Sequence, residues 1–94
     1  MSYWRTTLVE FNSEKDADEA HAEYSKNAPS EYPEAEILLS NRTGPTSAVV
    51  TSVYPDKETA KKATAARNAR MEKAAHRMKS TEMLEGEVIL KVVR

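Results

Sequence analysis

The feature that most constrains this chain is a run from Asp56 to Lys79 that contains no glycine or proline. It is rich in alanine and in long polar side chains, which are the strongest helix formers. Pro55 discourages a central strand from continuing, and Asp56 can accept hydrogen bonds from the free N–H groups of a first helical turn. We therefore predict one long helix here, whose apolar face the rest of a 94-residue chain must cover.

The apolar side chains of this helix fall on one stripe at about 100° per residue. The stripe holds Ala60, Ala63, Thr64, Met71, Ala74, Ala75 and Met78. Arg67 projects from the middle of it. Because an isolated guanidinium is costly to bury, Arg67 needs a carboxylate, a bound anion or a route to water.

The remaining residues predict four strands and a second helix. That helix begins at Asn12 or Ser13, where Ser13 and Asp16 are spaced as in a capping box, and ends at Pro29. Strands are predicted where β-branched and aromatic residues gather: Tyr3–Phe11, Glu36–Asn41, Ser47–Tyr54 and Glu87–Val93. Ser80 and Thr81 are expected to interrupt the long helix, and Glu82–Glu85 to add one more helical turn before Gly86.

The order of these elements is β-α-β-β-α-β. The second and third strands are joined by a short turn containing Gly44 and Pro45, which implies an antiparallel hairpin. The order predicts an α+β fold class: a ferredoxin-like antiparallel sheet with two helices on one face. We expect residues 1–94 to form a single domain of this kind.

Both sides of the predicted strands carry apolar residues. Ile37 and Leu39 alternate with Leu38, and Trp4 and Leu8 lie opposite Val9 and Phe11. A sheet face in contact with water shows a cleaner polar alternation, and a large apolar patch is unstable there. We therefore predict a two-fold homodimer in which two sheets pack face to face as an α+β barrel.

Composition excludes several classes of function. The chain has 14 basic and 15 acidic residues, so no basic field favours nucleic acid. The absence of cysteine excludes disulfides, a thiolate nucleophile, an iron–sulfur cluster and a zinc–cysteine site. No apolar run approaches the roughly 20 residues that span a membrane, and no secretory signal is visible. We expect a soluble cytoplasmic protein that binds neither nucleic acid nor membrane.

No cofactor or metal is expected from the motifs. The chain lacks a glycine-rich phosphate loop and a nucleophile elbow, and its two histidines, His21 and His76, have no acid-rich partner motif. The third strand also lacks the basic, glycine and aromatic pattern of RNA-binding domains that share this topology.

The order of elements over the whole chain resembles the dimeric α+β barrel superfamily, which includes the antibiotic-biosynthesis monooxygenases. The segment Val53-Tyr54-Pro55-Asp56-Lys57-Glu58, leading through Asn68 to Arg70-Met71, is similar to the junction of strand three and helix in small uncharacterised members. The resemblance implies a ligand cavity within each subunit, between helices and sheet. Cofactor-free monooxygenases of the superfamily use an asparagine, a tryptophan and an arginine, and haem-degrading members use an asparagine, a tryptophan and a histidine. Neither set transfers, because Trp4 at the chain start is the only tryptophan.

The candidate ligand-binding residues are Arg67, His21, Tyr24, Met71 and Trp4. Arg67 either forms an internal ion pair with Glu10, Glu36 or another strand acid, extends its head to water, or anchors an acidic ligand. The alanines around it leave space for a cavity.

The other candidates also have two interpretations. His21 and Tyr24 are three residues apart on the inner face of the first helix. They form either a hydrogen-bonded core pair or a pair that orients a ligand carbonyl and moves a proton. Trp4 either packs in the sheet core or a dimer contact, or forms a stacking wall for a ligand.

Two functions remain. The first is a small-molecule-binding dimeric barrel, within which a cofactor-free monooxygenase or isomerase would act on a small acidic or aromatic compound. The alternative is a non-catalytic dimeric module for protein interaction or regulation. A polar-lined cavity of roughly 300 Å³ would favour the first.

Overall fold

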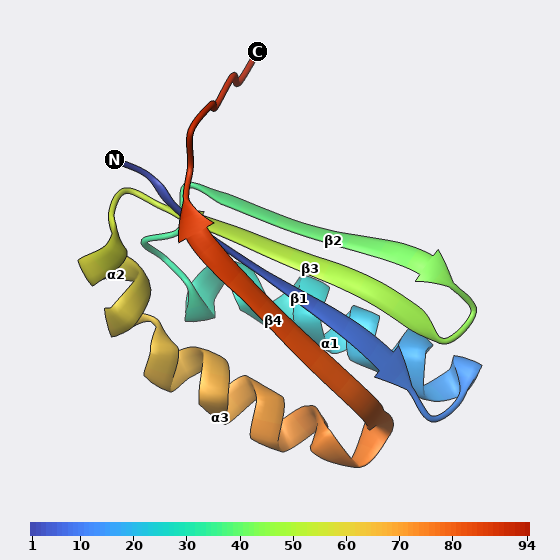
Figure 1. Cartoon of the computed structure of the whole chain (residues 1–94). Coiled ribbons are helices and arrows are strands. Elements are labelled where there is room, and N and C mark those ends of the chain that lie inside the picture. The colour runs from blue at the N-terminus through green and yellow to red at the C-terminus, as the bar shows by residue number, and fades with distance from the viewer.

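The computed structural model describes the whole chain, residues 1–94. Its sheet is built around the strand β1, which pairs with β3 on one side and with β4 on the other. The elements are β1 (Tyr3–Phe11), α1 (Glu14–Glu31), β2 (Ile37–Gly44), β3 (Ser47–Tyr54), α2 (Lys57–Lys62), α3 (Thr64–Ala74), the 3-10 turn η1 (Ala75–Arg77) and β4 (Met78–Glu87). The antiparallel sheet has the order β2-β3-β1-β4, and all the helices cover one face of it (Figure 1). The predicted ferredoxin-like architecture is confirmed.

Both helical regions begin at the predicted caps. Ser13 Oγ accepts a hydrogen bond from the N–H of Asp16 at 3.1 Å, and Asp56 Oδ1 accepts one from the N–H of Thr59 at 2.7 Å. α1 continues through Pro29 to Glu31, although Pro29 was predicted to end it. Proline removes one helical hydrogen bond and its ring crowds the preceding turn, and α1 ends two residues after Pro29.

The predicted long helix is divided at Ala63 into α2 and α3, and its helical turns end at Arg77 instead of Lys79. At the division, Arg5 Nη2 donates to the carbonyl oxygen of Ala60 at 3.2 Å. Helices bend where a side chain enters their hydrogen-bond ladder. The contact from β1 therefore explains why a segment of strong helix formers is interrupted.

The last strand was predicted wrongly. β4 spans Met78–Glu87, whereas the prediction placed a helical turn at Glu82–Glu85 and the strand at Glu87–Val93. The 3-10 turn η1 ends at Arg77, beside the end of β1, and the next residue, Met78, already pairs with Phe11 of β1. β4 is an exposed edge strand with a polar sequence. The prediction relied on hydrophobicity and therefore placed the strand in the more apolar segment that follows.

The core consists of two separate clusters on the inner face of the sheet. One contains Val9, Phe11, Ala17 and Ala48, and the other contains Tyr3, Tyr54 and Ala60. Along β1, the polar residues Arg5 and Thr7 lie between the two clusters, and both are buried. The centre of the helix–sheet layer is therefore polar.

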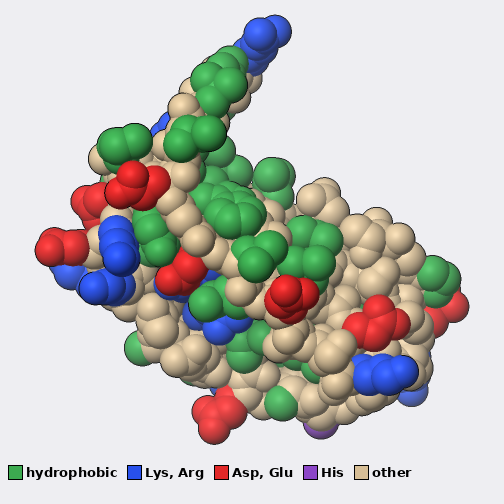
Figure 2. Space-filling view, in the orientation of Figure 1, with side chains coloured by type: hydrophobic (Ala, Val, Ile, Leu, Met, Phe, Trp, Pro, Cys, Tyr) green, Lys and Arg blue, Asp and Glu red, His purple; other side chains and the backbone are tan.

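No helix covers the outer face of the sheet, where most of the apolar side chains stay at least partly exposed and Val53 is buried. Register places Trp4, Leu8, Ile37, Leu39, Val49, Val53 and Leu84 on this face. Leu39 remains 52% exposed. Residues 88–94, here called the tail, leave the sheet and project away from it, and Ile89 is 94% exposed (Figures 1 and 2). The base of the tail is held by a hydrogen bond from the N–H of Val88 to the carbonyl of Ser2 at 2.9 Å.

No helix combines the length and the apolar character that crossing a membrane would require.

Candidate functional site

A cavity of about 90 Å³ lies between α1, α3 and the inner face of the sheet. It is smaller than the roughly 300 Å³ at which drug-sized ligand sites begin. It exceeds the roughly 10–15 Å³ that a single water molecule needs. In this conformation the cavity therefore fits only a small molecule.

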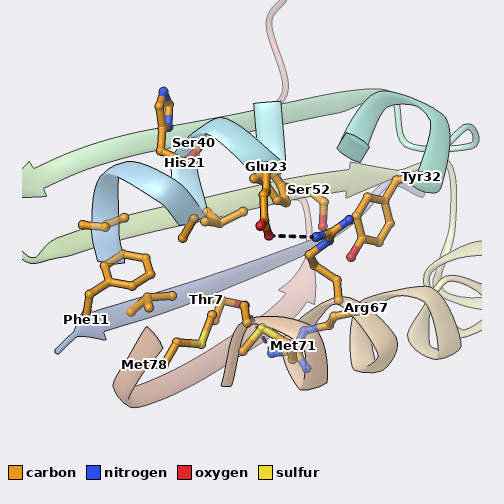
Figure 3. Close-up of a pocket in the computed structure, with 18 of the residues that line it drawn as sticks. Thr7, Phe11, His21, Glu23, Tyr32, Ser40, Ser52, Arg67, Met71 and Met78 are labelled. Carbon is orange, nitrogen blue, oxygen red and sulfur yellow. Dashed lines mark hydrogen bonds and ion pairs between the residues drawn. The ribbon is translucent and has the colours of Figure 1, made fainter. Parts of the chain in front are cut away.

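The two ends of the cavity differ in chemistry. Phe11 and Met78 lie at one end, and Arg67, Tyr32 and Ser52 lie towards the other (Figure 3). An occupant that matched both ends would have an apolar part and a polar or charged part.

The cavity wall carries an excess of positive charge. Four arginines line it, Arg5, Arg42, Arg67 and Arg70, but only one carboxylate does, that of Glu23. Three of the arginines form ion pairs: Arg5 with Glu85, Arg42 with Asp18, and Arg70 with Glu23 and Glu31. Arg67 forms none.

Arg67 makes its hydrogen bond to a neutral group. Its Nη2 donates to Thr7 Oγ1 at 3.3 Å. Neither acid named as its partner is available: Glu10 accepts from Thr46 Oγ1 at 2.7 Å, and Glu36 accepts from Lys91 Nζ at 3.0 Å. Partial burial first, and then the positive charge of Arg5, lower the pKa of Arg67, which still stays charged at neutral pH.

Arg5 is the site residue that sequence reasoning missed. It is 6% exposed, and its Nε forms an ion pair with Glu85 Oε2 at 3.3 Å. Its Nη2 donates to the Ala60 carbonyl at 3.2 Å and to Thr64 Oγ1 at 3.4 Å, while its buried Nη1 has no partner. The period of two along β1 could have found it, because that period puts Arg5 on the same face as Val9 and Phe11.

Two tyrosines from outside the predicted set also line the cavity. Tyr32 and Tyr54 are both buried, and Tyr32 lies with its ring centroid 6.5 Å from that of Tyr24. Burial, helped by the neighbouring Tyr54, raises the pKa of Tyr32 to about 12. Burial also raises the pKa of Tyr24. Tyr24 and Tyr32 therefore stay neutral near pH 7, so each hydroxyl can donate a hydrogen bond.

The structure divides the other predicted residues. Met71 and half-buried Tyr24 line the cavity with Arg67. His21 lies at the rim, and its ring points away into solvent (Figure 3), because Ala20 packs inward in its place. No hydrogen bond joins His21 to Tyr24. Trp4 lies on the outer face of the sheet, paired with Val53, because it is one residue out of phase with Arg5.

Ion pairs between α1 and α3–η1 close one side of the cavity. Glu23 Oε2 lies 2.9 Å from Arg77 Nη1 and 3.7 Å from Arg70 Nη1 (Figure 3), and Glu31 Oε1 lies 2.7 Å from Arg70 Nη2. The hydrogen bond from Arg77 lowers the pKa of Glu23. Glu23 is thus an ionised structural partner. The arginines of the cavity wall could hold an anion, and no three potential metal ligands lie together.

Comparison with known proteins supports the fold. The sequence matches no protein-family model and no curated protein. Among solved structures, a dimeric ferredoxin-like protein from an uncultured marine organism has a TM-score of 0.79 and 12% identity, with 99% of this chain and 92% of that chain covered.

Two further solved structures that share the fold are described as monooxygenases. A candidate antibiotic biosynthesis monooxygenase from Nitrosomonas europaea has a TM-score of 0.80 and 13% identity, covering 94% of this chain and 90% of that chain. A monooxygenase from Streptomyces coelicolor in complex with the ligand nanaomycin D has a TM-score of 0.77 and 7% identity, covering 99% and 92%. The predicted resemblance to the dimeric ferredoxin-like and antibiotic-biosynthesis monooxygenase structures is confirmed at the level of the fold.

Proposed function

We propose that this protein binds a small organic acid between its helices and sheet, with Arg67 as the anchor for the acid group. The observation that carries the proposal is the charge of the cavity wall, where four arginines face one carboxylate and Arg67 has no ion pair. A carboxylate is the natural partner of a guanidinium, since it can accept two parallel N–H hydrogen bonds.

The enzymatic form of this proposal is a cofactor-free monooxygenase or isomerase acting on the bound acid. The likeness to the Streptomyces coelicolor monooxygenase supports it only through the shared fold. The arrangement of side chains supports binding better than chemistry, because His21 points away and Glu23 is held by two arginines. Oxygen consumption with each acid that binds would reveal a monooxygenase, and proton exchange into that acid would reveal an isomerase.

The test is a thermal-shift screen of short-chain and aromatic carboxylic acids against wild type, Arg67→Met and Arg42→Met. Arg42→Met is the matched control, because Arg42 also lines the cavity but is paired with Asp18 near the surface. We expect acids to stabilise wild type and Arg42→Met, and to lose most of that effect on Arg67→Met. Equal stabilisation of all three proteins would remove Arg67 from the site.

The alternative, a non-catalytic interaction or regulatory module, is favoured by the small volume of the cavity. It also required Arg67 to be paired internally with an acid, and no such pair is found. Because Arg67 has no ion pair, we favour the ligand-binding function over the interaction module.

We also propose that the protein is a homodimer that packs through the outer sheet face. Support comes from the exposed side chains of Leu8, Leu39 and Leu84 on that face and from the apolar tail beside it. Both surfaces are of the kind that a second copy would remove from water.

A further inference from the structure

We propose that Arg5 and Arg67 together bind one ligand head group, and that the ligand is a short 2-oxo monocarboxylic acid. The carboxylate would lie between the two guanidinium groups, with the neighbouring oxo oxygen accepting a further N–H bond. This rests on the proposed function, and adds to it a second arginine and a defined class of acid.

The two arginines reach across the same space from opposite sides. Arg5 extends from β1 to Thr64 at the start of α3, whereas Arg67 extends from α3 back to Thr7 on β1. Thr7 is two residues after Arg5 on the same face of β1, and Thr64 is one helical turn before Arg67. The two guanidinium groups are therefore neighbours at the polar end of the cavity.

Free donors are the first argument for a ligand here. A guanidinium has five N–H groups. Arg5 uses its Nε and both hydrogens of Nη2, and Arg67 uses one, which leaves about six N–H groups between them. Arg5 Nη1 is buried without a partner, a state that native proteins avoid. A carboxylate offers about four acceptor positions, and an adjacent oxo oxygen raises the number towards six.

Charge selects a monoanion. The two arginines carry two positive charges, and the one acid paired with them, Glu85, removes one, which leaves a net charge of +1. A monocarboxylate balances this charge. A dicarboxylate or a phosphate brings more negative charge than the site can neutralise.

The other end of the cavity selects a short organic acid over an inorganic anion. Val9, Phe11 and Met78 line it and offer apolar contact to a carbon chain. A cavity of about 90 Å³, well below the volume of drug-sized ligand sites, favours a short chain.

Isothermal titration calorimetry with matched ligands tests the inference on the full-length protein. The ligands are 2-oxobutanoate, butanoate, succinate and inorganic phosphate, of which the first two differ only at the oxo oxygen. We expect 2-oxobutanoate to bind about tenfold more tightly than butanoate, the effect of one hydrogen bond to a charged donor. Succinate and phosphate should bind more weakly than 2-oxobutanoate.

Variants then assign the preference to Arg5. Arg5→Lys keeps the charge and can still pair with Glu85, but it loses the planar fork, so the ratio between the two acids should fall towards one. Arg67→Met should weaken the binding of both acids. Lys73→Met, at an exposed position of α3 outside the cavity, should change the binding of neither.

The outcomes separate the two proposals. If butanoate binds as tightly as 2-oxobutanoate to wild type, or phosphate binds more tightly, the 2-oxo acid inference is wrong while Arg67-dependent acid binding stands. If the preference survives Arg5→Lys unchanged, Arg5 has no part in it. If no organic acid binds wild type, both proposals are wrong. The wild-type comparison needs no variant, so a misfolded Arg5 protein would leave that test intact.

Discussion

At the scale of single residues, two positive charges share one partly dry space. Arg67 is half-buried, and Arg5 contributes to lowering its pKa. Repulsion by Arg5 and loss of hydration both disfavour the charged Arg67 side chain in the folded state. In the absence of ligand, the methionine variant should therefore be at least as stable as wild type. We expect the free energy of unfolding of Arg67→Met, measured in urea, to equal or exceed that of wild type by up to about 1 kcal/mol. Arg67→Ala serves as the control for lost packing, and a loss in Arg67→Met as large as in Arg67→Ala would mean that Arg67 is a structural residue.

Tyr32 gives the protein a predictable response to alkali. Its pKa is about 12 in the folded state and about 10 when exposed to water. The folded state therefore holds its proton more tightly, so this contribution to stability is complete below pH 10 and is lost as pH rises towards 12. We expect the urea midpoint to fall between pH 10 and 12, and to fall less in Tyr32→Phe. An identical decline in both proteins would show that Tyr32 is not the group responsible.

Site residues could be predicted from the sequence where the periodicity of a single helix or strand determines which way a side chain faces. Arg67 and Met71 share the apolar stripe of one helix, and the cavity contains both. Tyr32 could not be found this way, because it follows α1 and is positioned by its burial against other elements. Arg5 was within reach of the alternation along β1.

At the scale of elements, signals local to a few residues were reliable. The caps at Ser13 and Asp56 lie where hydrogen-bond chemistry predicted them. The division of the long helix and the position of β4 depend on contacts with β1 that are distant in sequence, namely Arg5 with Ala60 and Phe11 with Met78. The hydrophobicity pattern alone could therefore predict neither the division of the long helix nor the position of β4.

The ion pairs between α1 and α3–η1 predict a response to acid. Glu23 has a pKa below its usual value of 4.5, chiefly because Arg77 donates to it. A lowered folded-state pKa stabilises the protein above 4.5, and that stability is lost as pH falls below this value. We expect Glu23→Gln to reduce the change in thermal midpoint between pH 5 and about pH 3. Glu72→Gln, at an exposed position on α3, is the control and should behave as wild type; if it flattens the profile equally, the effect belongs to net charge.

At the scale of the whole molecule, the outer sheet face and the tail raise the same problem. The face presents Leu8, Leu39 and Leu84 to solvent. The tail extends beyond the sheet (Figure 2), and five of its seven residues are apolar. The β4 prediction failed because the tail resembles a sheet strand in sequence. An extended apolar segment without a strand partner is suited to pairing with another chain.

These surfaces lead to a prediction about assembly. We expect sedimentation equilibrium at micromolar concentration to give twice the chain mass of 10.5 kDa. Leu39→Lys should shift the equilibrium towards monomer, because it places a charge among the apolar side chains of the proposed interface. Deleting residues 88–94 should weaken the dimer as well, since the tail contributes apolar area beyond the sheet face. Lys57→Glu, on the exposed start of α2 on the helical side, is the control and should remain dimeric. A wild-type mass of one chain would show that these apolar surfaces stay in water, and a dimer that survives Leu39→Lys would place the contact elsewhere.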